Sequence, residues 1–248
     1  MTDALQVKAL DVARPPGSVA ATVDVLAGAV ARAVSGADGA FGLDGVVGGW
    51  ADPVVGLGAV RVLGADALAP FLFTGRPLSA SDVEVVQAAI RVFPVPYRED
   101  PGDARVWRCR DWALGEVLAH LGVSEPAGDP AAALDSGGED GCAGELAWPV
   151  WSASVSRLSV LALPAVGGPV REQVRRRRRD IWRGLARAML RHDHFSAARL
   201  ARWLALDAAV CSESLLGAAL SHLELFTAPP PRVHLEIALA RRLWEDGQ

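Results

Sequence analysis

The feature that most constrains this fold is an arginine-rich stretch that runs from Pro169 to Leu206. Pro169 suits the first turn of a helix, because the backbone N–H that proline lacks would be unpaired there anyway. Apolar residues then recur about every four positions, as on the core-facing side of a helix. The apolar stripe comprises Ile181, Trp182, Leu185, Met189 and Leu190, and the basic stripe beside it comprises Arg176, Arg179, Arg183, Arg187 and Arg191. The pattern predicts one long amphipathic helix over about 170–191, with one side for a core and one for water or an acidic partner.

The charge of the chain is unevenly placed, although its net value is only −4. Residues 171–202 hold eleven arginines against three acidic residues, whereas residues 122–147 hold six acidic residues and no basic one. Two solvated surfaces would explain this pattern. Alternatively, the acidic stretch folds over the basic helix, or one of the two patches docks a partner. The arginines that would face an acidic partner are Arg175, Arg176, Arg179, Arg183 and Arg187.

The first half of the chain predicts a mixture of helices and short strands. Ser18 can cap a helix over 19–34, and Ser79 and Ser81 can start a second helix over 82–92. The glycine-rich residues 36–49 are not expected to be helical. Residues 54–62 alternate glycine with β-branched residues, which favours a strand. A short apolar run at 71–77 and a third expected strand at 106–110 would complete a small β element.

The second half predicts helices almost throughout. A helix over 112–121 is followed by a Gly-, Ala-, Pro- and acid-rich loop at about 124–145. Residues 155–163 fit a strand or a helix, and the spacing of the apolar residues favours a helix. Further helices are expected over 197–206, 212–226 and 233–244. The predicted fold class is therefore α+β, mostly α-helical with a small β-sheet, in a single globular domain over residues 1–248.

Composition indicates an intracellular protein and a GC-rich source. The three cysteines, Cys109, Cys142 and Cys211, are far apart and read as reduced thiols. No signal peptide or clean membrane span is expected, and Thr2 excludes N-myristoylation. Lysine and asparagine, which have AT-rich codons, are nearly or wholly absent, as in proteins of actinobacteria or of some large DNA viruses.

Candidate nucleic-acid and metal sites are each weak. The predicted helices 197–206 and 212–226 have the lengths of a helix-turn-helix, but the second carries no Arg, Lys, Asn or Gln to read bases. The pairs His192/His194, His222/Glu224 and His234/Glu236 are spaced two apart, so on a helix their members point in different directions. We therefore expect an ordinary helical hairpin and surface or capping histidines, with no metal site.

Catalytic and cofactor motifs are also missing. Cys211 precedes a predicted helix, which could lower its pKa, but a buried structural thiol is the better interpretation. Gly56 and Gly58 lack the third glycine of a dinucleotide-binding turn, and no phosphate-loop lysine follows any glycine run. The eight tryptophans are expected mostly in the core, and an exposed one would mark a docking face. No catalytic residue or cofactor is assigned, and the protein is not expected to be an enzyme.

Several short segments, in the same order along the chain, resemble a herpesvirus tegument family, cytoplasmic envelopment protein 1. They are residues 60–62, 71–77, 146–149, 195–206 and 233–243, and they cover about a third of the chain, mostly in its second half. The resemblance implies a compact, mostly helical fold with a small β-sheet and no enzymatic activity. It also implies a stable complex with a second, palmitoylated tegument protein, which brings both to Golgi-derived membranes.

The resemblance therefore implies a virion tegument protein of the host cytoplasm and Golgi that supports secondary envelopment and virus egress. It implies no direct contact with a membrane or with nucleic acid. The alternative hypothesis is a DNA-binding transcriptional regulator of an actinobacterial cytoplasm, which would use the arginine-rich helix 170–191 and the helices after it. A third possibility is a helical accessory enzyme with a pocket that no sequence motif reveals.

Overall fold

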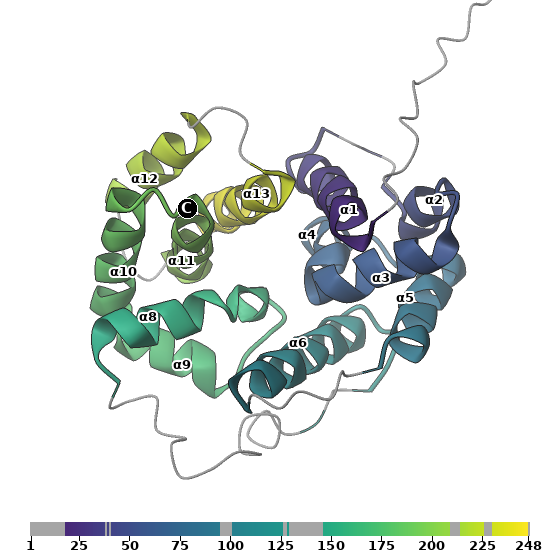
Figure 1. The fold of residues 1–248 in the computed structure, drawn as a ribbon, viewed down its shortest axis with the longest axis horizontal. Coiled ribbons are helices and arrows are strands. Elements are labelled where there is room, and N and C mark those ends of the chain that lie inside the picture. Colours follow the sequence, from purple (N-terminus) through teal and green to yellow (C-terminus); the bar gives the residue numbers. More distant parts are fainter. Residues whose placement is uncertain are drawn as a thin grey trace, which may run out of the picture.

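The computed structural model describes residues 18–37, 39, 41–94, 101–125, 128, 146–208, 214–225 and 230–247. Every regular element in these ranges is a helix (Figure 1). The prediction of an α+β fold with a small β-sheet was therefore wrong. The acidic loop at about 124–145 lies almost wholly outside the described residues. Whether it packs on the basic helix or stays in solvent therefore remains a prediction.

The helices fall into an earlier and a later group along the chain. The first group comprises α1 (Val19–Val34), α2 (Leu43–Gly48), α3 (Pro53–Leu63), the 3-10 turn η1 (Gly64–Leu68), α4 (Ala69–Thr74), α5 (Ala80–Val92) and α6 (Pro101–His120). The second comprises α8 (Trp148–Ser156), η2 (Ser159–Leu161), α9 (Pro169–Arg176), α10 (Arg178–Leu190), α11 (His194–Leu206), α12 (Ser214–Leu225) and α13 (Pro231–Asp246).

The glycine and valine alternation at 54–62 forms helix α3, not a strand. Asp52 caps this helix by accepting a hydrogen bond from the Val54 N–H at 2.9 Å, and Pro53 occupies its first turn. Gly56 lies against Trp50, so closely that an added Cβ would lie 2.6 Å from that ring. Gly56 thus allows α3 to pack closely against Trp50. The sequence pattern alone cannot distinguish a glycine needed for helix packing from a glycine in a strand.

The other predicted β segments are helical for related reasons. Residues 71–74 belong to α4, and the proposed strand at 106–110 lies in the middle of α6. Within the glycine-rich residues 36–49, which were expected to be non-helical, α2 forms one short helix. Residues 155–163 end α8 and form the turn η2, which agrees with the preference for helix.

The capping signals were read correctly at several helices. The expected bounds of α1 are confirmed, and the Ser18 side chain accepts from the Ala21 N–H. Ser79 and Asp82 form a reciprocal capping box at the start of α5. Gly122 has a φ of +75° after α6, the left-handed conformation that favours glycine.

The predicted single arginine-rich helix is two helices. Arg177, with φ −105° and ψ 26°, interrupts it between α9 and α10. The following helix begins at His194, three residues before the expected start at 197, because Asp193 caps it by accepting the Ser196 N–H at 3.0 Å. His192 precedes this cap with a φ of +56° and ends α10 in the left-handed region.

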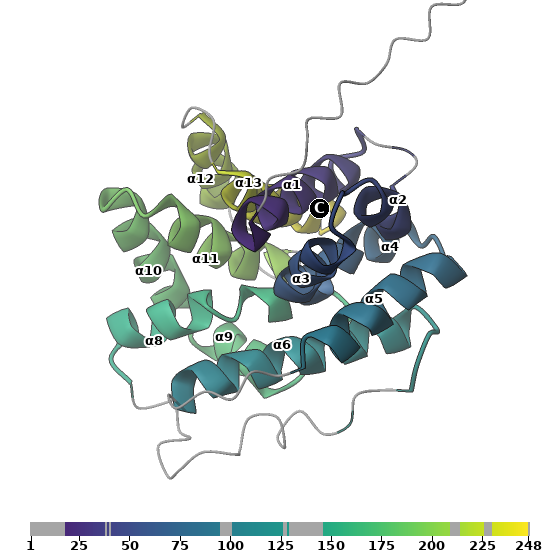
Figure 2. The same cartoon turned by 45° about the vertical axis from the view of Figure 1, so that its right-hand side comes forward.

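The two groups of helices surround a shared interior (Figures 1 and 2). The C-terminal α13 packs on both α11 and α1, so the first and last helices of the described chain lie side by side (Figure 1). The 3-10 turns η1 and η2 contact each other and α6, and the residues of both turns are buried in the interior. Trp151 and Trp203 are fully buried, and the other six tryptophans are partly buried, so the expectation of core tryptophans holds.

The segment Pro53–Thr74, which runs from α3 through α4, is long and apolar enough to cross a membrane by length and composition alone. In the folded chain, 78% of its apolar window is buried by the rest of the protein. Arg61 and Asp66 lie within it and make the interior contacts described below. The segment is therefore placed as a core element.

Candidate functional site

A network of charged side chains occupies the centre of the fold. Arg202 of α11 has no solvent exposure, and its guanidinium donates to Asp66 Oδ1 at 2.6 Å and to Glu236 Oε2 at 3.0 Å. Its Nε donates to the Ala162 carbonyl at 3.0 Å. Burial lowers the pKa of Arg202, but the charges and hydrogen bonds of Asp66 and Glu236 outweigh it and raise the pKa overall. The network joins η1, α11 and α13.

Two further groups complete the network on Glu236. Ser159 of η2 donates its hydroxyl to Glu236 Oε1 at 2.8 Å, and Arg199 Nε donates to the same oxygen at 3.2 Å. The Arg199 guanidinium also stacks on the Phe195 ring, 3.7 Å from its centroid. Both oxygens of this carboxylate are thus bound by positive or donor groups, which offsets the cost of its burial.

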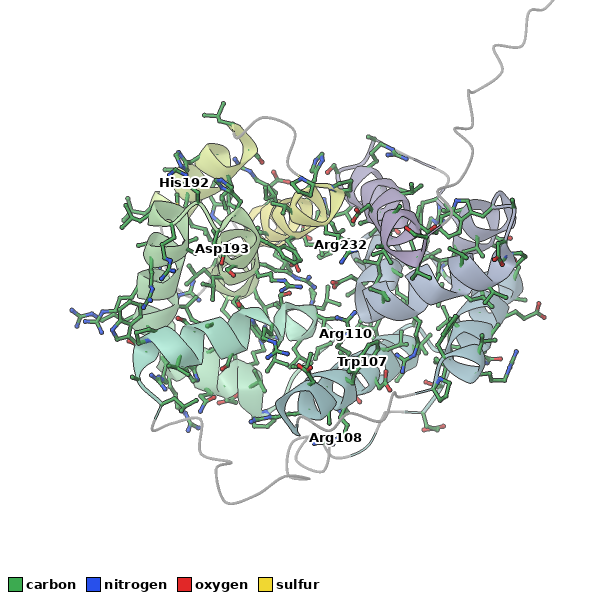
Figure 3. The ribbon with its side chains drawn as sticks, in the orientation of Figure 1. Trp107, Arg108, Arg110, His192, Asp193 and Arg232 are labelled. Carbon is green, nitrogen blue, oxygen red and sulfur yellow. The ribbon has the colours of Figure 1, made fainter. Side chains whose placement is uncertain are left out.

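A small pocket of about 70 Å³ opens beside this network. It is lined by side chains from α3, η1, α6, η2, α11 and α13, and by Arg157 directly after α8. Four arginines line it, namely Arg110, Arg157, Arg199 and Arg232, against the two acids Asp66 and Glu236. Figure 3 shows Arg110 on the inner side of α6 and Arg232 on α13 across the interior.

Arg110 differs from the other arginines of the pocket. It has no hydrogen bond or ion pair within the described part of the chain, and its buried Nε has no partner there. The guanidinium lies over the Trp107 ring at 5.4 Å. Burial lowers the pKa of Arg110; Asp66 opposes this change, whereas Arg199 and Arg61 reinforce it. The positive charge of Arg110 in this pocket is therefore only partly balanced by nearby acids.

Arg61 shares the Trp107 ring but has its own partners. It donates Nε to the Phe93 carbonyl at 2.7 Å and binds the Asp111 carboxylate with both terminal nitrogens. Its guanidinium lies 5.2 Å from the Trp107 centroid. Because both terminal nitrogens of Arg61 bind the Asp111 carboxylate, this acid does not pair with Arg110.

A second candidate site is the basic face of α9 and α10. We use this name for the exposed arginines Arg175, Arg176, Arg179, Arg183, Arg187 and Arg191. Arg175 pairs with Asp207 at 2.8 Å and Arg183 with Asp180 at 3.3 Å. Arg176, Arg179 and Arg191 have no ion pair within the described ranges. Each of the five arginines that the sequence singled out is thus on the surface, as expected.

The run Arg175–Arg179 is divided between surface and interior. Arg177 stacks on Trp151 at 4.2 Å, pairs with Asp180 and donates to the Leu146 carbonyl at 3.0 Å. Arg178 donates to the Leu204 carbonyl at 2.7 Å. Arg177 and Arg178 thus bind α10 to α8, α11 and the segment before α8. Only the other three arginines of the run Arg175–Arg179 are exposed for recognition.

A large apolar side chain lies within the basic face. Leu190 is 83% exposed, between Arg187 and Arg191 in the sequence. The Arg187 guanidinium lies 5.9 Å from the Trp148 centroid. A groove of about 230 Å³ runs between α8, α10 and the start of α11, with Arg187 and Arg191 among its lining residues.

The histidines predicted to be ordinary surface or capping groups form no shared site. His192 and His194 lie at the turn between α10 and α11, with ring centroids 6.0 Å apart (Figure 3). His234 is exposed whereas Glu236 is buried, so that pair diverges as its spacing predicted. Among the described residues, no group of three or more His, Cys, Asp or Glu could hold a metal ion.

The remaining sequence candidates also fall elsewhere. Helix α12 packs on α11 and α13, and its Glu224 pairs with Arg241 at 2.7 Å. Cys109 is buried in α6, and burial raises the pKa of its thiol. Cys142 and Cys211 lie outside the described residues. Gly56 and Gly58 are inside α3 and present no phosphate-binding turn.

The sequence reasoning missed the central pocket. Arg61, Asp66, Arg110 and Asp111 interrupt apolar or helical stretches of the N-terminal half, and a charge inside an apolar run signals a buried ion pair. Glu236 was considered only as a metal ligand. No family model, no curated protein and no solved structure matches the chain.

Proposed function

We propose that this protein is a non-enzymatic assembly factor that docks an acidic protein partner on the basic face of α9 and α10. The observation that carries the proposal is a stripe along α10, in which Arg179, Arg183, Arg187 and Leu190 are all exposed. These positions are three or four apart, so they lie along one side of the helix. Such a stripe presents a long, rigid recognition surface.

The chemistry of this stripe favours a protein over other partners. Arginine and tryptophan are among the residues that dominate binding energy at protein interfaces, and here the Arg187 guanidinium lies over the Trp148 ring. Leu190 adds exposed apolar area to the same stripe. A partner helix with carboxylates flanking an apolar residue would match both features.

Within this proposal, the more specific role is the one implied by the tegument resemblance. The protein would join a second, palmitoylated tegument protein and act with it at Golgi-derived membranes in secondary envelopment. The partner would then supply the membrane attachment. The resemblance covers Leu146–Pro149, at the start of α8, and Phe195–Leu206 in α11, so two of its segments adjoin the groove beside the basic face.

The alternative is a DNA-binding regulator that uses the same arginines on phosphates. Phosphate contacts require only exposed cations, which this face offers. Helix α12 is poorly suited to read a DNA sequence, because it carries no Arg, Lys, Asn or Gln and because Arg241 already binds its Ser221 and Glu224. The two proposals differ in what they expect of Leu190, which would matter for a protein partner only.

The test is co-expression with the candidate palmitoylated tegument protein, followed by size exclusion and calorimetry. Arg187→Glu should weaken the complex at least tenfold, about 1.4 kcal/mol, and Leu190→Ser should weaken it as well. Arg91→Glu on α5 is the matched control, because Arg91 is also exposed and without an ion pair in the described chain. If Arg187→Glu and Arg91→Glu behave alike, the basic face is not the docking site.

The alternative is tested on the same variants. Double-stranded DNA should show no retention at 150 mM salt, the condition at which nonspecific binding is usually weak. Retention that falls steeply with salt, is lost in Arg187→Glu and is unaffected by Leu190→Ser would favour the regulator and overturn the assembly role.

A further inference from the structure

The charges around the central pocket do not balance. Three guanidinium groups, those of Arg110, Arg199 and Arg202, face two carboxylates, those of Asp66 and Glu236. Arg202 and Arg199 take up both carboxylates through the hydrogen bonds given above. One positive charge therefore remains, on the side chain whose Nε is buried without a partner, Arg110.

A buried cation without a counter-charge is costly, and proteins usually supply one. The neighbouring acids cannot do so here: Asp111 is held by Arg61, and Asp66 and Glu236 are held by Arg202. The stack on Trp107 offsets part of the cost but offers no hydrogen-bond acceptor. An acceptor from outside the described chain would fit this position.

The rim of the pocket carries two further arginines, each paired with a partly exposed acid. Arg157 pairs with Asp103, and Arg232 pairs with Asp24 at 2.9 Å. Both pairs are substantially exposed, and exposed ion pairs of this kind contribute little stability. Their guanidinium groups can therefore turn toward a ligand in the pocket at low cost.

We propose that this pocket binds a phosphoryl group, held by Arg110 from inside and by Arg157 and Arg232 at the rim. The volume of about 70 Å³ corresponds to roughly two water molecules of ~30 Å³ each, so it suits a small oxoanion and not a whole nucleotide. A phosphoryl group has three acceptor oxygens, one for each of these three arginines, whereas a carboxylate has only two. Arginine binds phosphate through paired N–H donors in a fork geometry.

This site is independent of the proposed docking function, because none of its lining residues belongs to the basic face of α9 and α10. The group could come from free phosphate or from a phosphomonoester whose remaining atoms pass the rim. Both sources share the same recognition chemistry. They are distinguished below by the ligand used.

The test is calorimetric titration of the full chain with inorganic phosphate, with O-phosphoserine and with acetate, each at matched ionic strength. We expect both phosphate compounds to bind, and the tighter one to identify the source. Arg110→Gln should weaken binding at least tenfold, whereas Arg91→Gln, the same change on an exposed arginine of α5 outside both candidate sites, should leave it unchanged. Full binding in Arg110→Gln, or equal binding of acetate, would overturn the proposal.

A thermal measurement separates binding from a merely structural role of Arg110. Without phosphate, Arg110→Gln should unfold at an equal or higher temperature than the natural chain, because it removes an unpaired buried charge. The phosphate-dependent rise in midpoint should be lost. If Arg110→Gln fails to fold, Arg232→Gln at the rim replaces it, and undiminished phosphate binding in that variant would count against the site.

Discussion

At the level of single residues, the most consequential side chain is a charge with no access to water. Arg202 is enclosed by α11, α13 and η1, and it forms hydrogen bonds to two carboxylates and one backbone carbonyl. Such a network contributes little net stability compared with apolar packing. It does, however, strongly penalise any change that removes only one of its members, since the others then remain buried and unpaired.

Arg202→Met tests that penalty. The substitution keeps the volume but leaves Asp66 and Glu236 without their main partner, so we expect the free energy of unfolding to fall by about 3–5 kcal/mol in denaturant titrations. Combining it with Asp66→Asn and Glu236→Gln removes the stranded charges and should recover a large part of the loss. A loss below about 1 kcal/mol for Arg202→Met alone would contradict this account of the network.

Asp207, at the end of α11, makes stability depend on pH. Burial raises the pKa of Asp207, but hydrogen bonds from Arg175 and Arg171 outweigh this and hold the pKa below its ordinary 3.8. A lowered folded-state pKa contributes stability above the unfolded value, which is lost as the pH falls through the folded pKa. The ion pair should therefore be fully effective at neutral pH and fail only below about pH 4.

Asp207→Asn is the corresponding experiment. At pH 7 we expect the variant to be about 1–2 kcal/mol less stable, a figure reduced because Arg175 is half exposed. The difference from the natural chain should shrink as the pH is lowered toward 2, measured by denaturant titration at each pH. A difference that stays constant with pH would show that the loss comes from packing and not from the carboxylate charge.

At the level of elements, α10 lies close to α8 because of one glycine. A Cβ on Gly184 would lie 2.6 Å from the Ser152 Cβ, closer than two such atoms approach in real proteins. The same contact forms the floor of the groove beside the basic face. The distance between α8 and α10, and hence the docking surface, depends on the absence of a side chain at this position.

Gly184→Ala should therefore cost about 1–3 kcal/mol in unfolding free energy, although alanine is the better helix former. Gly45→Ala in α2 is the matched control, because an added Cβ there meets nothing within 4 Å. That variant should gain up to about 1 kcal/mol from propensity alone. Equal effects of the two substitutions on thermal or denaturant midpoints would show that α8 and α10 are not in tight contact.

Caps and periodicity predicted most helices of this chain, since both signals are local. Ser18 and Ser79 accept backbone N–H groups of the next few residues, so the sequence alone reveals them. The error at α3 arose from Gly56, which lies against Trp50 and not in a strand. Local sequence does not show which side chain a glycine will face. The break at Arg177 was also hidden, because Arg177 is stabilised by Trp151 and Leu146 from another segment.

The two candidate sites also differ in how well the sequence alone could predict them. The basic face lies on one continuous stretch, and helical spacing predicted its arginines. The central pocket joins Asp66 to Arg202 across 136 residues, and Arg110 comes from a third segment that was expected to be a strand. Only the tertiary arrangement brings these charges together.

At the level of the whole molecule, the buried network connects the two groups of helices. Asp66 belongs to the first group, whereas Arg202 and Glu236 belong to the second, and α1 packs on α13 nearby. A contact of this kind couples the stability of both groups, because opening either one exposes charges and apolar surface of the other. The prediction that residues 1–248 form a single domain can therefore be tested through one side chain.

Native-state hydrogen exchange on Asp66→Asn provides that test. If the groups unfold together, the slowest amides of α1, α11 and α13 should all lose protection by the same free energy, although the substitution lies in η1 alone. Asp44→Asn in α2 is the control, since Asp44 is exposed and its carboxylate accepts hydrogen bonds from Gly45 and from Ser81 of α5, both within the first group of helices. Loss of protection confined to α1, with α11 and α13 unchanged, would instead mean that two separately folding units are joined by a dispensable charge cluster.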